Sequence, residues 1–74
     1  MSRLKNISLA TVSLNMFKIA TPSVAGEDQN AILFLKPGES VDEALWLVAD
    51  DANLSYNANI IDGYIKKNIL TRLP

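Results

Sequence analysis

The fold that we predict rests on one stretch, residues 31–52, which reads AILFLKPGESVDEALWLVADDA. Its first part, residues 31–36, is a short apolar run that stops abruptly at Pro37-Gly38. A run of this length that is bounded by turn residues is typical of a buried strand. We therefore predict a strand over residues 31–36 and a turn directly after it.

The second part of this stretch carries the signature of a helix start. Ser40 is followed three residues later by Glu43, which makes a capping box in which each side chain bonds a backbone N–H at the helix start. The sequence therefore predicts a helix over residues 41–52. Trp46 and Leu47 fall outside its main apolar face, so this helix is either sandwiched or presents a second face to a partner. The main face consists of Val41, Ala44, Leu45, Val48 and Ala52.

Upstream, residues 6–20 combine alternating apolar residues with β-branched residues. The alternation slips near residues 11–12 and again near residues 16–17, which a strand with a bulge explains. A helix over the same residues is the alternative, because periodicity alone does not separate the two in a short run. Residues 21–30 are mostly polar and are predicted to be a loop between two antiparallel strands.

Downstream, an Asn-rich turn region over residues 53–59 leads into a second predicted helix over residues 58–72. Asp50 and Asp51 would lie near the C-terminal end of the first helix, where the helix dipole disfavours negative charge. Gly63 lies inside the second helix, which predicts either the close approach of another backbone or a later helix start.

Together these elements predict an α+β fold in a single small globular domain, residues 1–74. Two or three antiparallel strands (about 6–20 and 31–36) come first. Two helices (about 41–52 and 58–72) then pack on one face of the sheet. If residues 6–20 form a helix instead, the fold is mostly helical.

The composition excludes most catalytic chemistry. The chain has no cysteine and no histidine, which removes disulfides, thiolate metal sites, most imidazole metal sites and histidine-dependent catalysis. Hydrophobic residues make up 49% of the chain and charged residues 20%, a balance typical of a globular protein. We expect no catalytic residue, no cofactor site and no metal site, and hence a protein that is not an enzyme.

Charge and the N-terminal residues bear on location. The formal net charge is −1, which gives no electrostatic argument for binding nucleic acid or an anionic membrane. No apolar run approaches the roughly 18 residues that span a bilayer. Arg3 and Lys5 precede an apolar segment as in a secretory signal, but polar residues interrupt that segment. We expect a cytoplasmic protein without membrane contact.

Several residues are candidates for a protein interface. A chain of 74 residues buries only about 60% of its unfolded surface, so self-association is a natural source of stability. Tryptophan and tyrosine are frequent interface anchors. We expect Trp46 to be partly exposed in the isolated chain and buried by a second chain, with a homodimer as one form. The candidate interface residues are Trp46, Leu47, Tyr56, Tyr64, Lys66 and Lys67.

Residues 45–70 also permit a helix-turn-helix motif as the alternative. Asn53 and Leu54 fit the turn of that motif. Asn59 and Asp62 fall where the second helix of the motif requires apolar residues. A DNA-binding regulator that uses residues 45–70 is therefore the alternative function.

Residues 34–45 read FLKPGESVDEAL. This segment resembles part of a group of short uncharacterised proteins common in pseudomonads, which carry a similar Phe-x-x-x-Gly-x-x-x-x-x-Ala-Leu stretch. The resemblance implies a small bacterial protein with no assigned activity.

We interpret the chain as a small non-enzymatic interaction protein, a regulator or inhibitor of the phage or plasmid type, whose partner is itself or a foreign protein.

Overall fold

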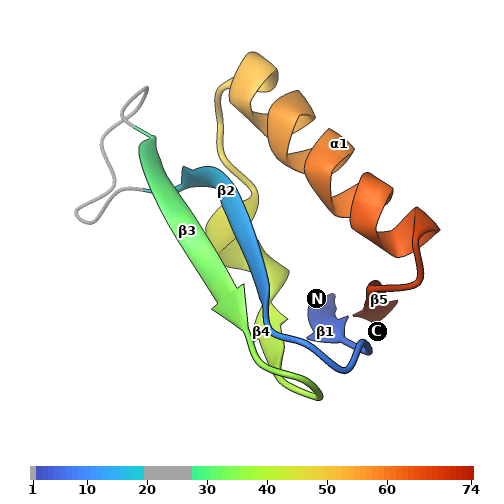
Figure 1. Cartoon of the computed structure of the whole chain (residues 1–74). Coiled ribbons are helices and arrows are strands. Elements are labelled where there is room, and N and C mark those ends of the chain that lie inside the picture. Colours follow the sequence, from blue (N-terminus) through green and yellow to red (C-terminus); the bar gives the residue numbers. More distant parts are fainter. Residues whose placement is uncertain (1, 20–27) are drawn as a thin grey trace.

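The computed structural model describes residues 2–19 and 28–74, and Figure 1 shows the arrangement of their elements. The strands form two antiparallel sheets, one in the order β4-β1-β5 and one that pairs β2 with β3. The predicted α+β class is confirmed, but the described part of the chain has five strands and one α-helix, where two or three strands and two helices were predicted. The elements in chain order are β1 (Arg3–Asn6), β2 (Val12–Lys18), β3 (Gln29–Leu35), β4 (Ser40–Asp42), the 3-10 helix η1 (Glu43–Trp46), α1 (Asp51–Lys66) and β5 (Leu70–Leu73).

The strand interpretation of residues 6–20 is confirmed over β2, and the helical alternative is wrong. β2 buries every second residue from Val12 to Met16, as a strand with one covered face does. β3 covers most of the strand predicted over 31–36 and pairs with β2 in antiparallel register. Most of the predicted loop over residues 21–30 lies outside the described residues.

The first slip in the alternation, at residues 11–12, marks the start of β2, where a bulge was predicted. Residues 7–11, predicted as strand, form a loop between β1 and β2. β1 ends at Asn6, whose side chain is fully buried. Its amide group donates to the carbonyls of Ala10 and Leu35, both at 2.8 Å, and its Oδ1 accepts from the backbone N–H of Ser8 at 2.9 Å. One side chain therefore folds the loop over residues 7–11 and ties it to the end of β3.

The helix predicted over residues 41–52 is wrong. Ser40–Asp42 form β4, and Val41 lies opposite Leu4 of β1. The Ser40 hydroxyl accepts a hydrogen bond from Arg3 Nε at 3.3 Å and caps no helix. Residue 41 pairs with β1 and packs against the core, and this tertiary arrangement overrides the local capping signal.

The residues after β4 turn sharply inward. The Asp42 carboxylate accepts from the backbone N–H of Ala44 at 2.9 Å and so caps η1. This single turn carries Trp46 into the core, where 4% of its surface is exposed. A full α-helix would have placed the indole off the buried face, so burial of the largest side chain is consistent with the tighter turn.

The α-helix begins at Asp51, within the segment that was predicted to end the first helix. The Asp50 carboxylate accepts from the backbone N–H of Asn53 at 3.0 Å, which makes Asp50 the N-cap. Asp50 and Asp51 therefore lie at the positive end of the helix dipole, where their charge is favourable. The turn predicted over residues 53–59 is wrong, since these residues form the first half of α1.

α1 ends at Lys66, six residues before the predicted end. Asn68 adopts a left-handed conformation with φ of 59°. The backbone N–H of Asn68 bonds to the Ile65 carbonyl and that of Ile69 bonds to the Tyr64 carbonyl, both at 3.0 Å. These two bonds make a Schellman motif, which stops the helix and turns the chain into β5.

The close backbone approach predicted at Gly63 is also wrong. Among the described residues, no atom beyond the neighbouring backbone lies within 4 Å of the position that a Cβ would take. A later helix start is excluded as well, because α1 already begins at Asp51. Gly63 is simply a helical residue with no side chain.

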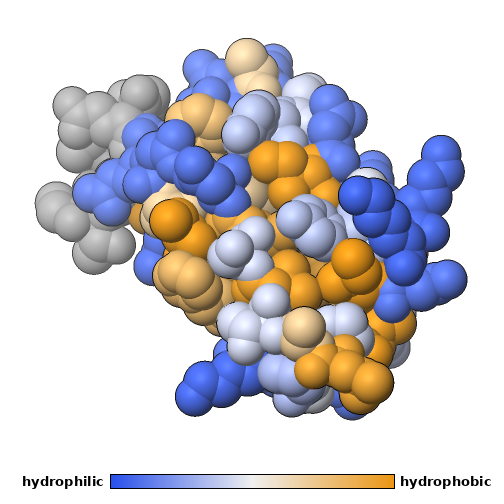
Figure 2. All heavy atoms as spheres, in the orientation of Figure 1, coloured by the Kyte–Doolittle hydropathy of each residue, from blue (hydrophilic) through white to orange (hydrophobic). Residues whose placement is uncertain are grey.

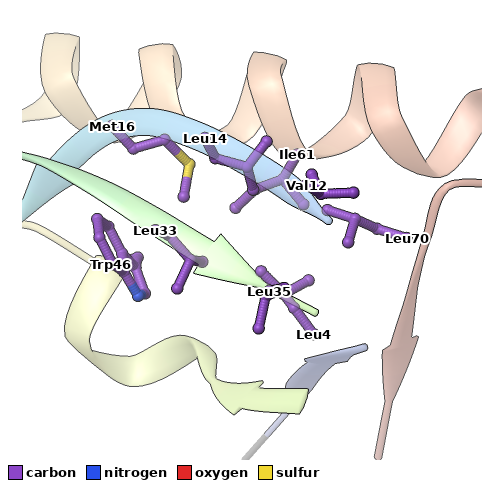
Figure 3. Close-up of a cluster of buried hydrophobic side chains, with 9 residues drawn as sticks. All are labelled: Leu4, Val12, Leu14, Met16, Leu33, Leu35, Trp46, Ile61 and Leu70. Atoms are coloured by element: carbon purple, nitrogen blue, oxygen red, sulfur yellow. The ribbon is translucent and has the colours of Figure 1, made fainter. Parts of the chain in front are cut away.

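The core lies between the two sheets, η1 and one face of α1 (Figure 3). In the described chain it draws on every element except β4, whose Val41 packs against it from outside. The buried apolar side chains of this cluster are Leu4, Val12, Leu14, Met16, Leu33, Leu35, Trp46, Ile61 and Leu70.

Candidate functional site

β3 lies at the margin of the molecule. Its sheet contains only β2 and β3, and in Figure 1 β2 lies between β3 and α1. No strand within residues 2–19 and 28–74 pairs with the other side of β3. One long edge of the β3 backbone therefore has no strand beside it among these described residues.

The opposite edge of this sheet, along β2, is closed by a side chain from α1. Asn57 is buried, with Oδ1 accepting from the Phe17 N–H at 2.8 Å and Nδ2 donating to the Phe17 carbonyl at 2.7 Å. Asn57 Nδ2 also donates to the Trp46 carbonyl at 2.9 Å. Directly after the end of β2, the Ile19 N–H donates to the Leu45 carbonyl at 3.0 Å. The amide of Asn57 thus occupies the position of a neighbouring strand.

These bonds fix the direction of the backbone groups on β3. In an antiparallel pair, residues alternately direct both polar groups to the partner strand or away from it. Phe17 directs its groups to Asn57, so Phe17 and its opposite residue, Asn30, form a non-hydrogen-bonded pair. By the same alternation Asn30, Ile32 and Phe34 all direct their N–H and C=O groups to the outer edge of β3. These are the groups that an added strand would bond.

The side chains beside this edge are apolar and exposed. Ile32 is 53% exposed and Phe34 is 62% exposed, both on the outer face of the β2–β3 hairpin. Their cross-strand neighbours on β2, Asn15 and Ser13, are polar. Figure 2 shows hydrophobic residues over the hairpin, between it and α1 and at the lower right margin, with hydrophilic residues among them. On the outer face of the β2–β3 pair, the exposed apolar side chains therefore lie on β3.

The other strand edges carry the features that usually prevent strand addition. β4 is only three residues long and includes Asp42. β5 contains Arg72 and is followed by Pro74, which has no N–H to donate. β3, by contrast, reads QNAILFL, with no charge and no proline. Among the described strands, β3 alone combines length, an apolar face and an unprotected edge.

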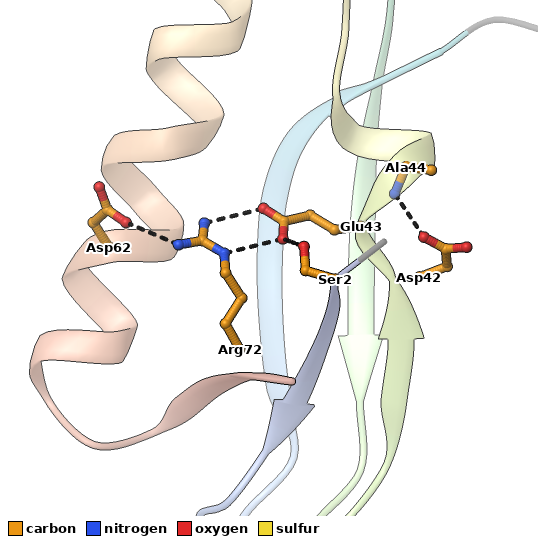
Figure 4. Close-up of polar contacts among 6 residues, drawn as sticks. All are labelled: Ser2, Asp42, Glu43, Ala44, Asp62 and Arg72. Atoms are coloured by element: carbon orange, nitrogen blue, oxygen red, sulfur yellow. Dashed lines mark hydrogen bonds and ion pairs between the residues drawn. The ribbon is translucent and has the colours of Figure 1, made fainter. Parts of the chain in front are cut away.

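A cluster of polar side chains, separate from the β3 edge, joins η1 to β5 (Figure 4). Glu43 is buried and accepts two hydrogen bonds from Arg72, through Nε and Nη2, each at 3.0 Å. Ser2 Oγ donates to the same carboxylate at 2.6 Å, and Asp62 on α1 lies 3.8 Å from Arg72 Nη1. The hydrogen bonds and ion pairs of this cluster connect the N-terminal residues, η1, α1 and β5.

The electrostatics of this cluster are those of a structural ion pair. Burial disfavours the charged form of Glu43, but hydrogen bonds from Arg72 and Ser2 and the charge of Arg72 outweigh it. The pKa of Glu43 therefore lies below its ordinary value of 4.5. The same pair raises the pKa of Arg72. A carboxylate held ionised by a bidentate guanidinium is poorly placed to act as an acid or base near neutral pH.

The other buried polar side chains also serve the fold. Asn6 and Asn57 use their amides on backbone groups of the same chain. Trp46 Nε1 is buried without a hydrogen-bond partner among the described residues. Within residues 2–19 and 28–74, no group of three or more acidic side chains converges as a metal site would require.

The structure separates the six predicted interface residues. Trp46 was expected to be partly exposed, and this expectation is wrong because its indole fills the core. Leu47, directly after it, is exposed. The others lie on or at the end of α1: Tyr56 packs edge-on against Phe17, and Tyr64 is partly buried. Lys66 and Lys67 are exposed, with Lys67 Nζ 5.8 Å from the centre of the Tyr64 ring.

The helix-turn-helix interpretation of residues 45–70 is wrong. These residues contain the end of η1 and a single α-helix, so the motif has no second helix to enter a DNA groove. As a separate finding, α1 falls short of the length and hydropathy that a membrane-crossing helix needs, and the described residues contain no other α-helix.

Sequence reasoning missed Ile32 and Phe34 as surface residues. Residues 31–35 are apolar without interruption, which indicates a strand covered on both faces. The available signal was the predicted layering: helices that pack on one face of the sheet leave its other face uncovered.

Compared with known proteins, the chain matches no family model, no curated protein and no solved structure. The resemblance of residues 34–45 to the pseudomonad proteins therefore stays an expectation. In the structure this segment forms the end of β3, a turn, β4 and most of η1.

Proposed function

We propose that this chain is a non-enzymatic interaction protein, a small regulator or inhibitor that binds another polypeptide by strand addition at the outer edge of β3. The observation that carries the proposal is the coincidence of an unprotected seven-residue edge with exposed Ile32 and Phe34. In strand addition, main-chain hydrogen bonds supply affinity and alternate side chains supply specificity.

The placement of polar groups supports a binding role over a catalytic one. The chain lacks histidine and cysteine, and Glu43, Asn6 and Asn57 are occupied by contacts within the fold. The β3 edge, in contrast, consists of groups whose natural complement is another backbone. We expect this binding to take place in the cytoplasm.

The test is affinity capture from a lysate with tagged wild type and two variants. Ile32→Lys puts a charge at the middle of the edge strand, which disfavours pairing. Asn15→Lys is the matched control, because Asn15 lies directly opposite Ile32 on the same face but on β2. Captured protein and nucleic acid are both quantified by mass spectrometry and absorbance.

Proteins retained by wild type and by Asn15→Lys but lost with Ile32→Lys support binding at the β3 edge. The same captured set for all three chains would contradict it, as would capture of nucleic acid alone. Circular dichroism and emission from Trp46, the single tryptophan, verify that each variant is folded.

A further inference from the structure

We propose that the occupant of the β3 edge is a second copy of this chain, paired antiparallel through β3 about a two-fold axis at Ile32. This inference rests on the proposed function and specifies its partner. The product is a continuous four-stranded sheet in the order β2-β3-β3-β2 across the two copies. Such an interface is isologous, since the same edge serves both copies.

The hydrogen-bonding pattern selects this register. Asn30, Ile32 and Phe34 direct their polar groups outward, and these residues are spaced evenly about Ile32. With the axis at residue 32, Ile32 faces the partner's Ile32, and Asn30 faces the partner's Phe34. Every outward N–H then meets an outward C=O. A shift by two residues in either direction would leave one of the three residues on each copy without a partner.

Charge and side-chain chemistry agree with self-pairing. β3 carries no charged residue, so two copies meet without like-charge repulsion. On the outer face, the two Ile32 side chains become direct neighbours, and each Phe34 lies beside the partner's Asn30. The exposed apolar residues of the two copies merge into one strip across the new ladder. A foreign strand would need a matching uncharged apolar edge, which this chain already has.

Sedimentation velocity over a wide concentration range tests association. Wild type and Asn15→Lys should form dimers. Ile32→Lys should weaken dimerisation about 100-fold or more, because the two-fold axis places two lysines side by side and removes the contact between the two isoleucines. Equal dimerisation of all three chains would overturn the proposal, as would a wild type that stays monomeric throughout.

Engineered thiols test the register, since the chain has no cysteine of its own. Facing residues of a hydrogen-bonded pair have Cα atoms about 5.5 Å apart, within disulfide range. Ile32→Cys should therefore cross-link to itself under mild oxidation. Residue 30 of one copy lies about 14 Å along the strand from residue 30 of the other, so Asn30→Cys should not. Ser13→Cys, exposed on β2, measures random collision.

A mixture of Asn30→Cys and Phe34→Cys copies should cross-link to each other and not to themselves. Cross-linking of Asn30→Cys or Phe34→Cys alone, above the Ser13→Cys level, would overturn the register centred on Ile32. If the wild type is monomeric but still captures a foreign protein through Ile32, the second copy is the wrong partner and the proposed function stands. If neither form of binding depends on Ile32, both proposals fail.

Discussion

Asn57 satisfies three backbone groups with one side chain. Its amide bonds the N–H and C=O of Phe17 and the carbonyl of Trp46, at 2.7 to 2.9 Å, and the residue is almost fully buried. Buried backbone groups that lose their partners cost more than the hydrogen bonds themselves contributed. The energetic weight of Asn57 is therefore larger than that of any exposed asparagine in α1.

We predict that Asn57→Ala lowers the free energy of unfolding by about 3 kcal/mol, because it leaves the backbone groups of Phe17 and the Trp46 carbonyl without hydrogen-bond partners. Asn59→Ala on the exposed side of the same helix should leave stability unchanged or raise it by about 0.5 kcal/mol through higher helix propensity. Urea unfolding followed by Trp46 emission measures both. Equal effects of the two changes would show that the Asn57 contacts contribute little.

Glu43 predicts a specific pH dependence. Its pKa in the folded chain is lower than the ordinary 4.5, so its contribution to stability is complete above 4.5 and is lost as the pH falls through the lowered value. Arg72 is 43% exposed, so solvent screens the pair, and we expect Glu43→Gln to cost about 1 kcal/mol at pH 7.

The difference in unfolding free energy between wild type and Glu43→Gln should stay constant from pH 7 to about 5 and shrink below 4.5. Urea titrations at a series of pH values test this. A difference that does not change down to pH 3 would mean that Glu43 is not held ionised by Arg72.

At the scale of elements, two cap residues distinguish the predicted helix start from the observed one. Asp50→Ala removes the N-cap of α1 and should cost about 1 kcal/mol. Ser40→Ala removes only an exposed contact with Arg3 and should change stability by less than about 0.5 kcal/mol. Thermal melts of the two variants decide the point, and a larger loss for Ser40→Ala would reinstate the helix over residues 41–52.

The elements that could be predicted are those whose signal is local and agrees with their tertiary role. β2 and β3 show period-two or continuous apolar patterns and turned out as strands. Ser40 and Glu43 have the spacing of a capping box, yet one pairs beside β1 and the other binds Arg72, 29 residues away. Neither partner is visible in a local window, because sheet pairing and ion pairing are set by distant residues.

The C-terminal boundary was missed for a different reason. Helix periodicity continues in the sequence beyond residue 66, and no glycine or proline interrupts it before Pro74. The stop signal is Asn68, one of the few residue types that tolerate a left-handed backbone. A single asparagine does not by itself predict the end of a helix unless the Schellman bonds around it are known.

At the scale of the whole molecule, self-pairing through β3 predicts stability that depends on concentration. Association that requires the folded chain shifts the unfolding equilibrium by mass action. The urea midpoint of the wild type should rise with protein concentration, while that of Ile32→Lys should stay constant. Trp46 emission reports both transitions without perturbation by the interface, since the indole lies in the core. A flat wild-type midpoint would count against the dimer.

The candidate site itself could not be read from sequence. The sequence predicts an interface anchor at Trp46, off the main face of a helix over residues 41–52, but that helix does not form and Trp46 is internal. The actual edge depends on which strand lies outermost, and strand order is a property of the complete fold. Self-association stays a proposal, and the residues proposed for it are Ile32 and Phe34 instead of Trp46.

The amide of Asn57 has one more consequence, which concerns the growth of assemblies. A sheet with one unpaired edge can add only one further copy, whereas a sheet with two unpaired edges can add copies without limit. Asn57 and α1 occupy the β2 edge and so prevent another strand from pairing there. Asn57→Ala leaves the N–H and C=O groups of Phe17 without partners, so we expect more sheet-mediated aggregation than from Asn59→Ala, measured as thioflavin T fluorescence after prolonged incubation.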